Sequence, residues 1–177
     1  MPTYYSETDK IREILDPKYI EGVVIDFGCG EHKIKPDAIG VDGRNLPSVD
    51  VVLEKQNDIY YPGLVDIPQD VDAVFSSHCL EHLIDDYKAI SAWSIIIKKG
   101  GYLILYLPDG DFYSHEGNLE HMRPYTYGSF MFWFRRVFCG EGKNYKGENA
   151  RPIFQLIESG QDIRPDCYSF YVIAQKL

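Results

Sequence analysis

The chain has 177 residues, of which 45% are hydrophobic and 25% are charged, and this composition is typical of one globular domain rather than of a disordered segment. Its formal net charge of -9 disfavours nucleic acid as the main partner, because an acidic surface repels phosphate groups. No apolar run approaches the roughly 18 residues that cross a membrane, and the polar first residues lack the apolar core of a signal peptide. We therefore expect a single domain over residues 1–177, cytoplasmic and without a membrane partner.

Short apolar runs alternate with helical patterns in the first half of the chain. Residues 8–15 (TDKIREIL) have apolar side chains at helical spacing, and Asp16-Pro17 ends this predicted helix. Four β-rich runs are apolar throughout instead of alternating, which is typical of parallel strands covered on both faces. These runs are residues 22–27, 38–42, 50–54 and 71–77.

The second half continues this alternation. A helical stripe over residues 80–98 is followed by Lys98, Lys99 and Gly100, which favour a helix end. The remaining elements that we predict are a strand over 101–107, a loop over 108–124, an aromatic amphipathic helix over 126–138, and two strands over 152–158 and 167–175. Alternating strands and helices predict an α/β domain around a mostly parallel sheet.

Cysteine spacing carries no functional signal. The four cysteines, Cys29, Cys79, Cys139 and Cys167, lie far apart and form no C-x-x-C pair. This spacing has neither a zinc nor a redox signature. We expect free thiols in a reducing compartment.

The first strand ends in a motif that suggests a ligand. Asp26 closes the strand, and Gly28 and Gly30 let the next turn pass tightly against a bound molecule. In open α/β sheets, ligands bind where the strands end. Taken alone, an ordinary strand-to-helix turn with a capping aspartate explains the same residues.

Five segments, in order and spacing, resemble the class I S-adenosylmethionine-dependent methyltransferases over most of residues 20–177. The segments are VVIDFGCG (23–30), IGVDGR (39–44), NDIYYP (57–62), DAVFSSHCLEHL (72–83) and IIIKKGGYLILYLPDG (95–110). The resemblance implies a single Rossmann-like domain with a mostly parallel seven-stranded sheet, the last strand antiparallel, and S-adenosylmethionine as cofactor.

The resemblance also implies cofactor contacts. By this resemblance, Asp42 binds the ribose hydroxyls, and Asp58 and the backbone amide of Ile59 bind the edge of the adenine. The chemistry of the cofactor is consistent with these contacts, because it carries an amino acid head, a ribose diol and a flat base. The full set of implied cofactor-binding residues is Asp26, Gly28, Cys29, Gly30, Asp42, Gly43, Asp58, Ile59, Ser76 and Ser77.

The chain departs from the family pattern at its first two crossovers. Only 12 positions separate Gly30 from Asp42 (42 − 30), about the minimum for a parallel crossover. The segment from Asp42 to Asp50 is also short for a helix. We therefore expect a trimmed member of the family, with the helices between strands one and two and between strands two and three shortened or replaced by turns.

The acceptor side is less defined. Methyl transfer is an in-line displacement, so positioning dominates, and a hydroxyl or amine acceptor can also need a base. The candidate bases after strands four and five are His78, His115 and His121, with His115 preferred because it lies closer to the strand end. A core or capping role explains His78 equally well. The histidines and acids of the 108–124 loop follow no recognised ligand spacing, so no metal site is predicted.

Three functions remain open. The first is methyl transfer to a hydroxyl or amine of a small molecule, with a sugar unit as one candidate acceptor. The second is a nicotinamide-dependent Rossmann oxidoreductase, which the absence of any Tyr-x-x-x-Lys pair disfavours. The third is a non-catalytic cofactor-binding subunit that uses an exposed aromatic helix at 126–138 to support a partner. The oligomeric state is not predicted.

Overall fold

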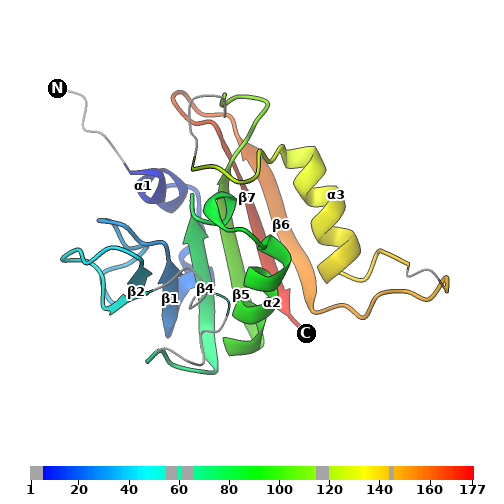
Figure 1. Cartoon of the computed structure of the whole chain (residues 1–177), viewed down its shortest axis with the longest axis horizontal. Helices are drawn as coiled ribbons and strands as arrows, with labels where there is room; N and C mark the ends of the chain where they lie inside the picture. The colour runs from blue at the N-terminus through cyan, green and yellow to red at the C-terminus, as the bar shows by residue number, and fades with distance from the viewer. Residues whose placement is uncertain (1–5, 55–59, 61–65, 115–119, 144–145) are drawn as a thin grey trace.

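The computed structural model describes residues 6–54, 60, 66–114, 120–143 and 146–177 (Figure 1). Its centre is one seven-stranded sheet in the order β3-β2-β1-β4-β5-β7-β6. The strands are β1 (Val24–Phe27), β2 (Ile39–Asp42), β3 (Val51–Val52), β4 (Val71–Ser77), β5 (Ile97–Pro108), β6 (Phe154–Asp162) and β7 (Ser169–Lys176). β7 runs antiparallel to both β5 and β6, whereas the other neighbouring pairs are parallel. The predicted sheet, including its antiparallel last strand, is confirmed.

Among the described residues, three α-helices and two short 3-10 turns accompany the sheet. They are α1 (Glu7–Arg12), η1 (Pro17–Ile20), η4 (Leu80–His82), α2 (Asp86–Ile96) and α3 (Tyr127–Phe138). The predicted helix over 80–98 is therefore wrong at both ends. Its start is a separate 3-10 turn, and Asp85 caps α2 by accepting a hydrogen bond from the Lys88 amide at 2.9 Å. Its predicted end, Lys98 to Gly100, is already part of β5.

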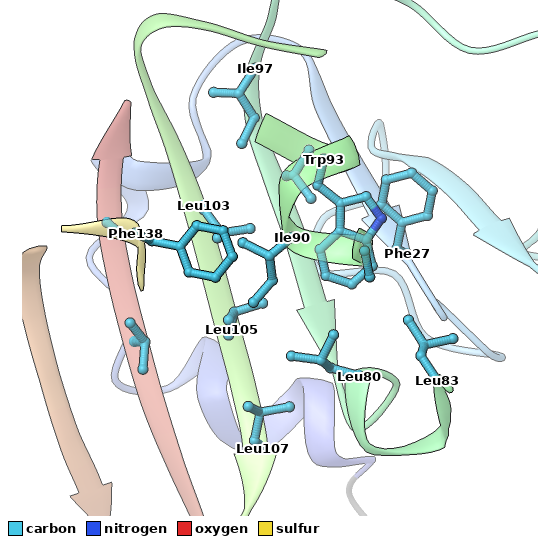
Figure 2. Close-up of a cluster of buried hydrophobic side chains, with 14 of the residues drawn as sticks. Phe27, Leu80, Leu83, Ile90, Trp93, Ile97, Leu103, Leu105, Leu107 and Phe138 are labelled. Carbon is cyan, nitrogen blue, oxygen red and sulfur yellow. The ribbon is translucent and has the colours of Figure 1, made fainter. Parts of the chain in front are cut away.

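The sheet is covered unequally on its two faces. On one face, α2 and α3 pack a large core, in which Trp93 stacks on Phe27 with ring centroids 5.1 Å apart (Figure 2). On the other face, α1 and η1 cover a smaller cluster that contains Ile11, Tyr19 and Ile34. None of the helices in the described part of the chain has the length and apolar composition that a bilayer crossing requires.

Turns replace both early crossover helices. Residues 28–38 and 43–50 contain no helix, so the expectation of shortened helices there resolves into turns. The N-terminal helix α1 partly covers the sheet in place of these crossover helices. It packs Ile11 into the smaller cluster, and Arg12 donates a hydrogen bond to the carbonyl of Ile34 at 2.9 Å. The carboxyl ends of β1 and β2 therefore lie beside short turns.

The aromatic side of α3 faces inward. Phe130, Phe134 and Phe138 are fully buried in the larger core, whereas Phe132 is 67% exposed. The burial of these three rings agrees with an amphipathic helix whose aromatic side is core, and it weighs against the exposed aromatic helix that the non-catalytic alternative requires.

Candidate active site

Gly28 and Gly30 turn the chain directly after β1, each with a positive φ, of 75° and 55° respectively. A Cβ added at Gly28 would lie 2.5 Å from the Cβ of Cys79, at the end of β4. The close approach that requires a glycine at position 28 is therefore made by the protein itself. Sequence reasoning attributed this glycine to a ligand, because the nearness of Cys79 depends on the pairing of β1 with β4.

Asp42 ends β2 beside this turn and is 8% exposed. It accepts hydrogen bonds from the amide of Gly30 at 2.9 Å, the amide of Arg44 at 2.9 Å and the Arg44 Nε at 3.1 Å. Burial alone would raise the pKa of Asp42, but the hydrogen bonds from Arg44 and Gly30 hold it below its ordinary value. The carboxylate is therefore charged at neutral pH and held at the turn.

The guanidinium of Arg44 shields this carboxylate, although two thirds of the Arg44 side chain (67%) is exposed. A carboxylate has about four acceptor sites, and Arg44 contacts both oxygens. Exposed ion pairs contribute little stability, so the arginine side chain can be displaced at small cost. The contact of the Arg44 side chain with the Asp42 carboxylate was not predicted from the sequence.

Two serines end β4 at the same edge of the sheet. The hydroxyl of Ser76 donates to the carbonyl of Phe27 at 3.1 Å and is fully buried. The hydroxyl of Ser77 is also buried, and it has no hydrogen-bond partner among the described residues. Asp58 and Ile59, the predicted adenine contacts, lie outside the described residues.

Asp26 lies beneath the turn and is 1% exposed. Its Oδ2 accepts a hydrogen bond from the amide of Ile34 at 2.7 Å, so the carboxyl fixes the path of the first crossover. Burial raises the pKa of Asp26 to about 7, against the opposing effects of the Ile34 amide and Lys33. A direct contact between Asp26 and the cofactor stays a prediction.

The Asp26→Asn variant is expected to lose a pH dependence of stability. From pH about 4 to about 7, the folded chain keeps a proton on Asp26 that the unfolded chain releases. The free energy of unfolding therefore falls as the pH rises through this window, by an amount on the order of a few kcal/mol. Asparagine can still accept the Ile34 amide, and urea unfolding at pH 4–8 measures the difference between variant and wild type.

Asp50→Asn is the matched control. The pKa of Asp50 is lowered by hydrogen bonds from Lys33 and the Gly40 amide, so its ionised form stabilises the folded chain. This variant should keep the decline of stability between pH 4 and 7. Parallel curves for wild type and Asp26→Asn across that window would contradict the assignment of Asp26.

His78 follows β4 in a strained conformation, with φ of 48°. Its Nε2 lies 2.8 Å from the hydroxyl of Ser169 on β7. Burial lowers the pKa of His78 to about 3, which makes the imidazole neutral and a weak base. These contacts favour a positioning role over general-base catalysis.

A cluster of ionisable side chains lies on the 3-10 turn after His78. Glu81 is fully buried, and the Nε2 of His82 lies 3.8 Å from its Oε1. The 108–124 loop returns to this turn, because the amide of Met122 donates to the Glu81 carbonyl at 2.8 Å. The ring of His121 thereby packs edge-on against that of His82, with centroids 4.7 Å apart. Of the predicted bases, His121 joins this cluster, and His115 lies outside the described residues.

Glu81 was not predicted as a site residue. The pattern that could have identified it is an acid directly before a histidine, shortly after a buried strand. Asp109 was counted among the polar groups of the acceptor loop. Asp109 is fully buried, and its Oδ2 accepts a hydrogen bond from Gln161 Nε2 at 2.8 Å. Its Oδ1 accepts from the amide of Tyr127 at 3.3 Å, so Asp109 joins the loop to α3 and β6.

Comparisons with known proteins agree with this geometry. Residues 42–105 match a family model described as a methyltransferase domain. No curated protein matches the sequence. The 1,6-didemethyltoxoflavin-N1-methyltransferase of Burkholderia thailandensis, solved with bound 1,6-didemethyltoxoflavin and S-adenosylhomocysteine, is similar in fold. It is 14% identical with a TM-score of 0.64, over 98% of this chain and 80% of that chain.

Two further solved structures share the fold. A TehB-like SAM-dependent methyltransferase from Corynebacterium glutamicum is 15% identical with a TM-score of 0.59, over 98% of this chain and 89% of that chain. A SAM dependent methyltransferase from Archaeoglobus fulgidus is 17% identical with a TM-score of 0.58, over 96% of this chain and 92% of that chain. The sheet and its turn-lined edge match the Rossmann-like fold of these methyltransferases. Together with the match over residues 42–105, the shared fold supports an S-adenosylmethionine-dependent methyltransferase, an enzyme with S-adenosylmethionine as its cofactor.

Proposed function

We propose that the protein transfers the methyl group of S-adenosylmethionine to a hydroxyl or amine of a small molecule. The observation that carries this proposal is the cluster of Glu81, His82 and His121, two of whose members lie on the 3-10 turn that follows β4. A small acceptor agrees with the net charge of -9, which disfavours nucleic acid. It also agrees with the Burkholderia neighbour, whose bound 1,6-didemethyltoxoflavin is a small molecule. A sugar unit remains one candidate acceptor.

The proposed cofactor contacts lie where the parallel strands of the sheet end. In this proposal the carboxylate of Asp42 accepts the two ribose hydroxyls after Arg44 moves aside, and the backbone of Gly30 and Gly43 lies against the ligand. Ser77 offers a hydroxyl at the end of β4 that has no hydrogen-bond partner in the described part of the chain. The other proposed members are Asp26, Gly28, Cys29 and Ser76, which shape the pocket, and Asp58 and Ile59, which lie outside the described residues.

Catalysis rests mainly on holding the acceptor in line with the methyl group and excluding water. His121 is the described candidate for the group that handles the acceptor proton, with His115 as its alternative. His78 acts in this proposal as a positioning residue, because its Nε2 already pairs with Ser169.

Incubation with methyl-labelled S-adenosylmethionine and separate pools of small molecules, RNA and protein tests the acceptor class. We expect the label in the small-molecule pool. Once the acceptor is identified, His121→Ala should lower turnover by roughly 10²-fold if that side chain is the base, with cofactor affinity preserved. His32→Ala, which removes an exposed histidine elsewhere, is the matched control. Label in RNA or protein alone would contradict the proposed substrate class.

A further inference from the structure

We propose that Glu81, His82 and His121 form a binding site for a divalent transition-metal ion on the acceptor side of the sheet. Each residue offers one ligand atom, and these three atoms lie within 4.8 Å of one another. Bonds of about 2.0–2.1 Å to one ion place neighbouring ligand atoms roughly 3–3.5 Å apart. Small rotations of the side chains are therefore enough to close the site.

The backbone holds the three side chains together. His82 follows Glu81 on η4, and the loop that carries His121 is attached to the same turn by the hydrogen bond from the Met122 amide to the Glu81 carbonyl, at 2.8 Å. A second bond, from the Arg123 amide to the same carbonyl at 3.3 Å, strengthens the attachment. The third ligand is thus fixed by tertiary structure, although 39 positions (121 − 82) separate it from the second.

Glu81 is the strongest indication of a cation site. Its side chain is fully buried, and neither carboxylate oxygen has a hydrogen-bond partner among the described residues. The nearest ring nitrogens, Nδ1 of His78 and Nε2 of His82, are both 3.8 Å from Oε1, too far for hydrogen bonds. Buried carboxylates are costly unless they are paired or coordinate a metal, so a bound cation would satisfy this group.

His82 is oriented as metal-binding histidines are. Its Nδ1 lies 3.1 Å from the carbonyl oxygen of Glu120, which can only accept, so Nδ1 carries the proton. The lone pair of the imidazole is therefore on Nε2, the atom nearer Glu81. A ring nitrogen that donates to a backbone carbonyl is the usual outer contact of a ligating histidine.

The ligand set indicates the class of ion. Two imidazoles and one carboxylate favour zinc, iron and related ions over magnesium and calcium, which prefer oxygen ligands. Three protein ligands leave coordination positions open. An acceptor oxygen bound at one of them would become more acidic. With His121 as a ligand, His115, the alternative named in the proposed function, is the candidate for the base. This last step rests on the proposed function, whereas the metal site does not.

Metal titration of the full chain tests the site without cofactor or acceptor. After treatment with a chelator, the protein is titrated with Zn²⁺ by calorimetry and with Co²⁺ by visible absorption. We expect one ion per chain and a cobalt spectrum without thiolate charge-transfer bands, since the four cysteines are not ligands. His82→Ala, His121→Ala and Glu81→Gln should each weaken binding by at least about 100-fold, because even outer contacts of ligands contribute 10–100-fold.

His32→Ala is the control, because it removes an exposed histidine that lies near Asp9 and outside the cluster. This variant should bind the metal as tightly as wild type does. His82 and His121 are both partly exposed, so at least one of their variants should keep the circular dichroism of the wild type if Glu81→Gln does not fold. Absence of binding to the wild-type chain, or unchanged affinity in folded His82→Ala and His121→Ala, would overturn the proposal. Neither result would bear on methyl transfer, which the labelling experiment measures separately.

Discussion

Asp42→Ala is expected to weaken the binding of S-adenosylmethionine by roughly 5- to 150-fold, because an unpaired polar group at a binding site costs about 1–3 kcal/mol. The variant would leave the ribose hydroxyls without their acceptor. It would also release the amide of Gly30, which Asp42 holds at 2.9 Å, and so loosen the turn beside the ligand. Calorimetric titration of wild type and variant with the cofactor measures the change.

Arg44→Ala supplies a control of opposite sign. Removing the guanidinium frees both oxygens of Asp42 from its side chain, so cofactor binding should be unchanged or tighter by up to about fivefold, the range of an exposed ion pair. Asp50→Ala, which removes an acid paired with Lys33 at the start of β3, should leave affinity unchanged. Equal affinity of Asp42→Ala and wild type would remove Asp42 from the cofactor site.

Gly28→Ala is expected to destabilise the fold by roughly 2–5 kcal/mol. The first part, about 1–2 kcal/mol, comes from the positive φ of 75° that alanine disfavours. The second part, about 1–3 kcal/mol, comes from overpacking, because the new Cβ would lie 2.5 Å from the Cβ of Cys79. Urea unfolding monitored by circular dichroism measures the sum.

The double variant Gly28→Ala/Cys79→Gly separates the two parts. Removing the Cys79 side chain relieves the overlap, so adding alanine at position 28 in the Cys79→Gly background should cost only the backbone part. Gly128→Ala is a further control, since its Cβ would meet no atom within 4 Å and alanine favours the helix. If Gly28→Ala unfolds at the same urea concentration as wild type, the turn does not pass Cys79 as closely as described.

Strands were the most predictable part of the fold. The run over 71–77 coincides with β4, in which Val71, Ala73, Val74 and Phe75 are fully buried, as expected for a strand covered on both faces. The helix predicted over 126–138 differs from α3 by one residue, since Thr126 is its cap, accepting the Ser129 amide at 3.2 Å. Local patterns fixed these elements because local interactions decide where they begin and end.

The start of β5 was not predictable in this way. Lys98, Lys99 and Gly100 are typical of a helix end, yet β5 begins at Ile97, where the chain pairs with Val71 of β4. The pairing of two strands that are 26 positions apart (97 − 71) overrides the local preference. Tertiary context decided this boundary.

The residues of the site also divide into those whose positions local patterns predict and those whose contacts depend on tertiary structure. The positions of Asp42 and Gly30 at the ends of the strands could be expected, since Asp42 ends one predicted strand and Gly30 follows another. The contact of Gly28 with Cys79 and the meeting of Glu81 with His121 could not be expected, because each joins segments that only the folded chain brings together. The capping of Asp42 by Arg44 is local, across two positions, but nothing in the residue pattern singled it out.

Titration of the full wild-type chain with S-adenosylmethionine, S-adenosylhomocysteine and NAD⁺ by calorimetry tests the central claim most directly. We expect the first two to bind with one molecule per chain and NAD⁺ not to bind. Binding of NAD⁺ without binding of either S-adenosyl compound would contradict the account.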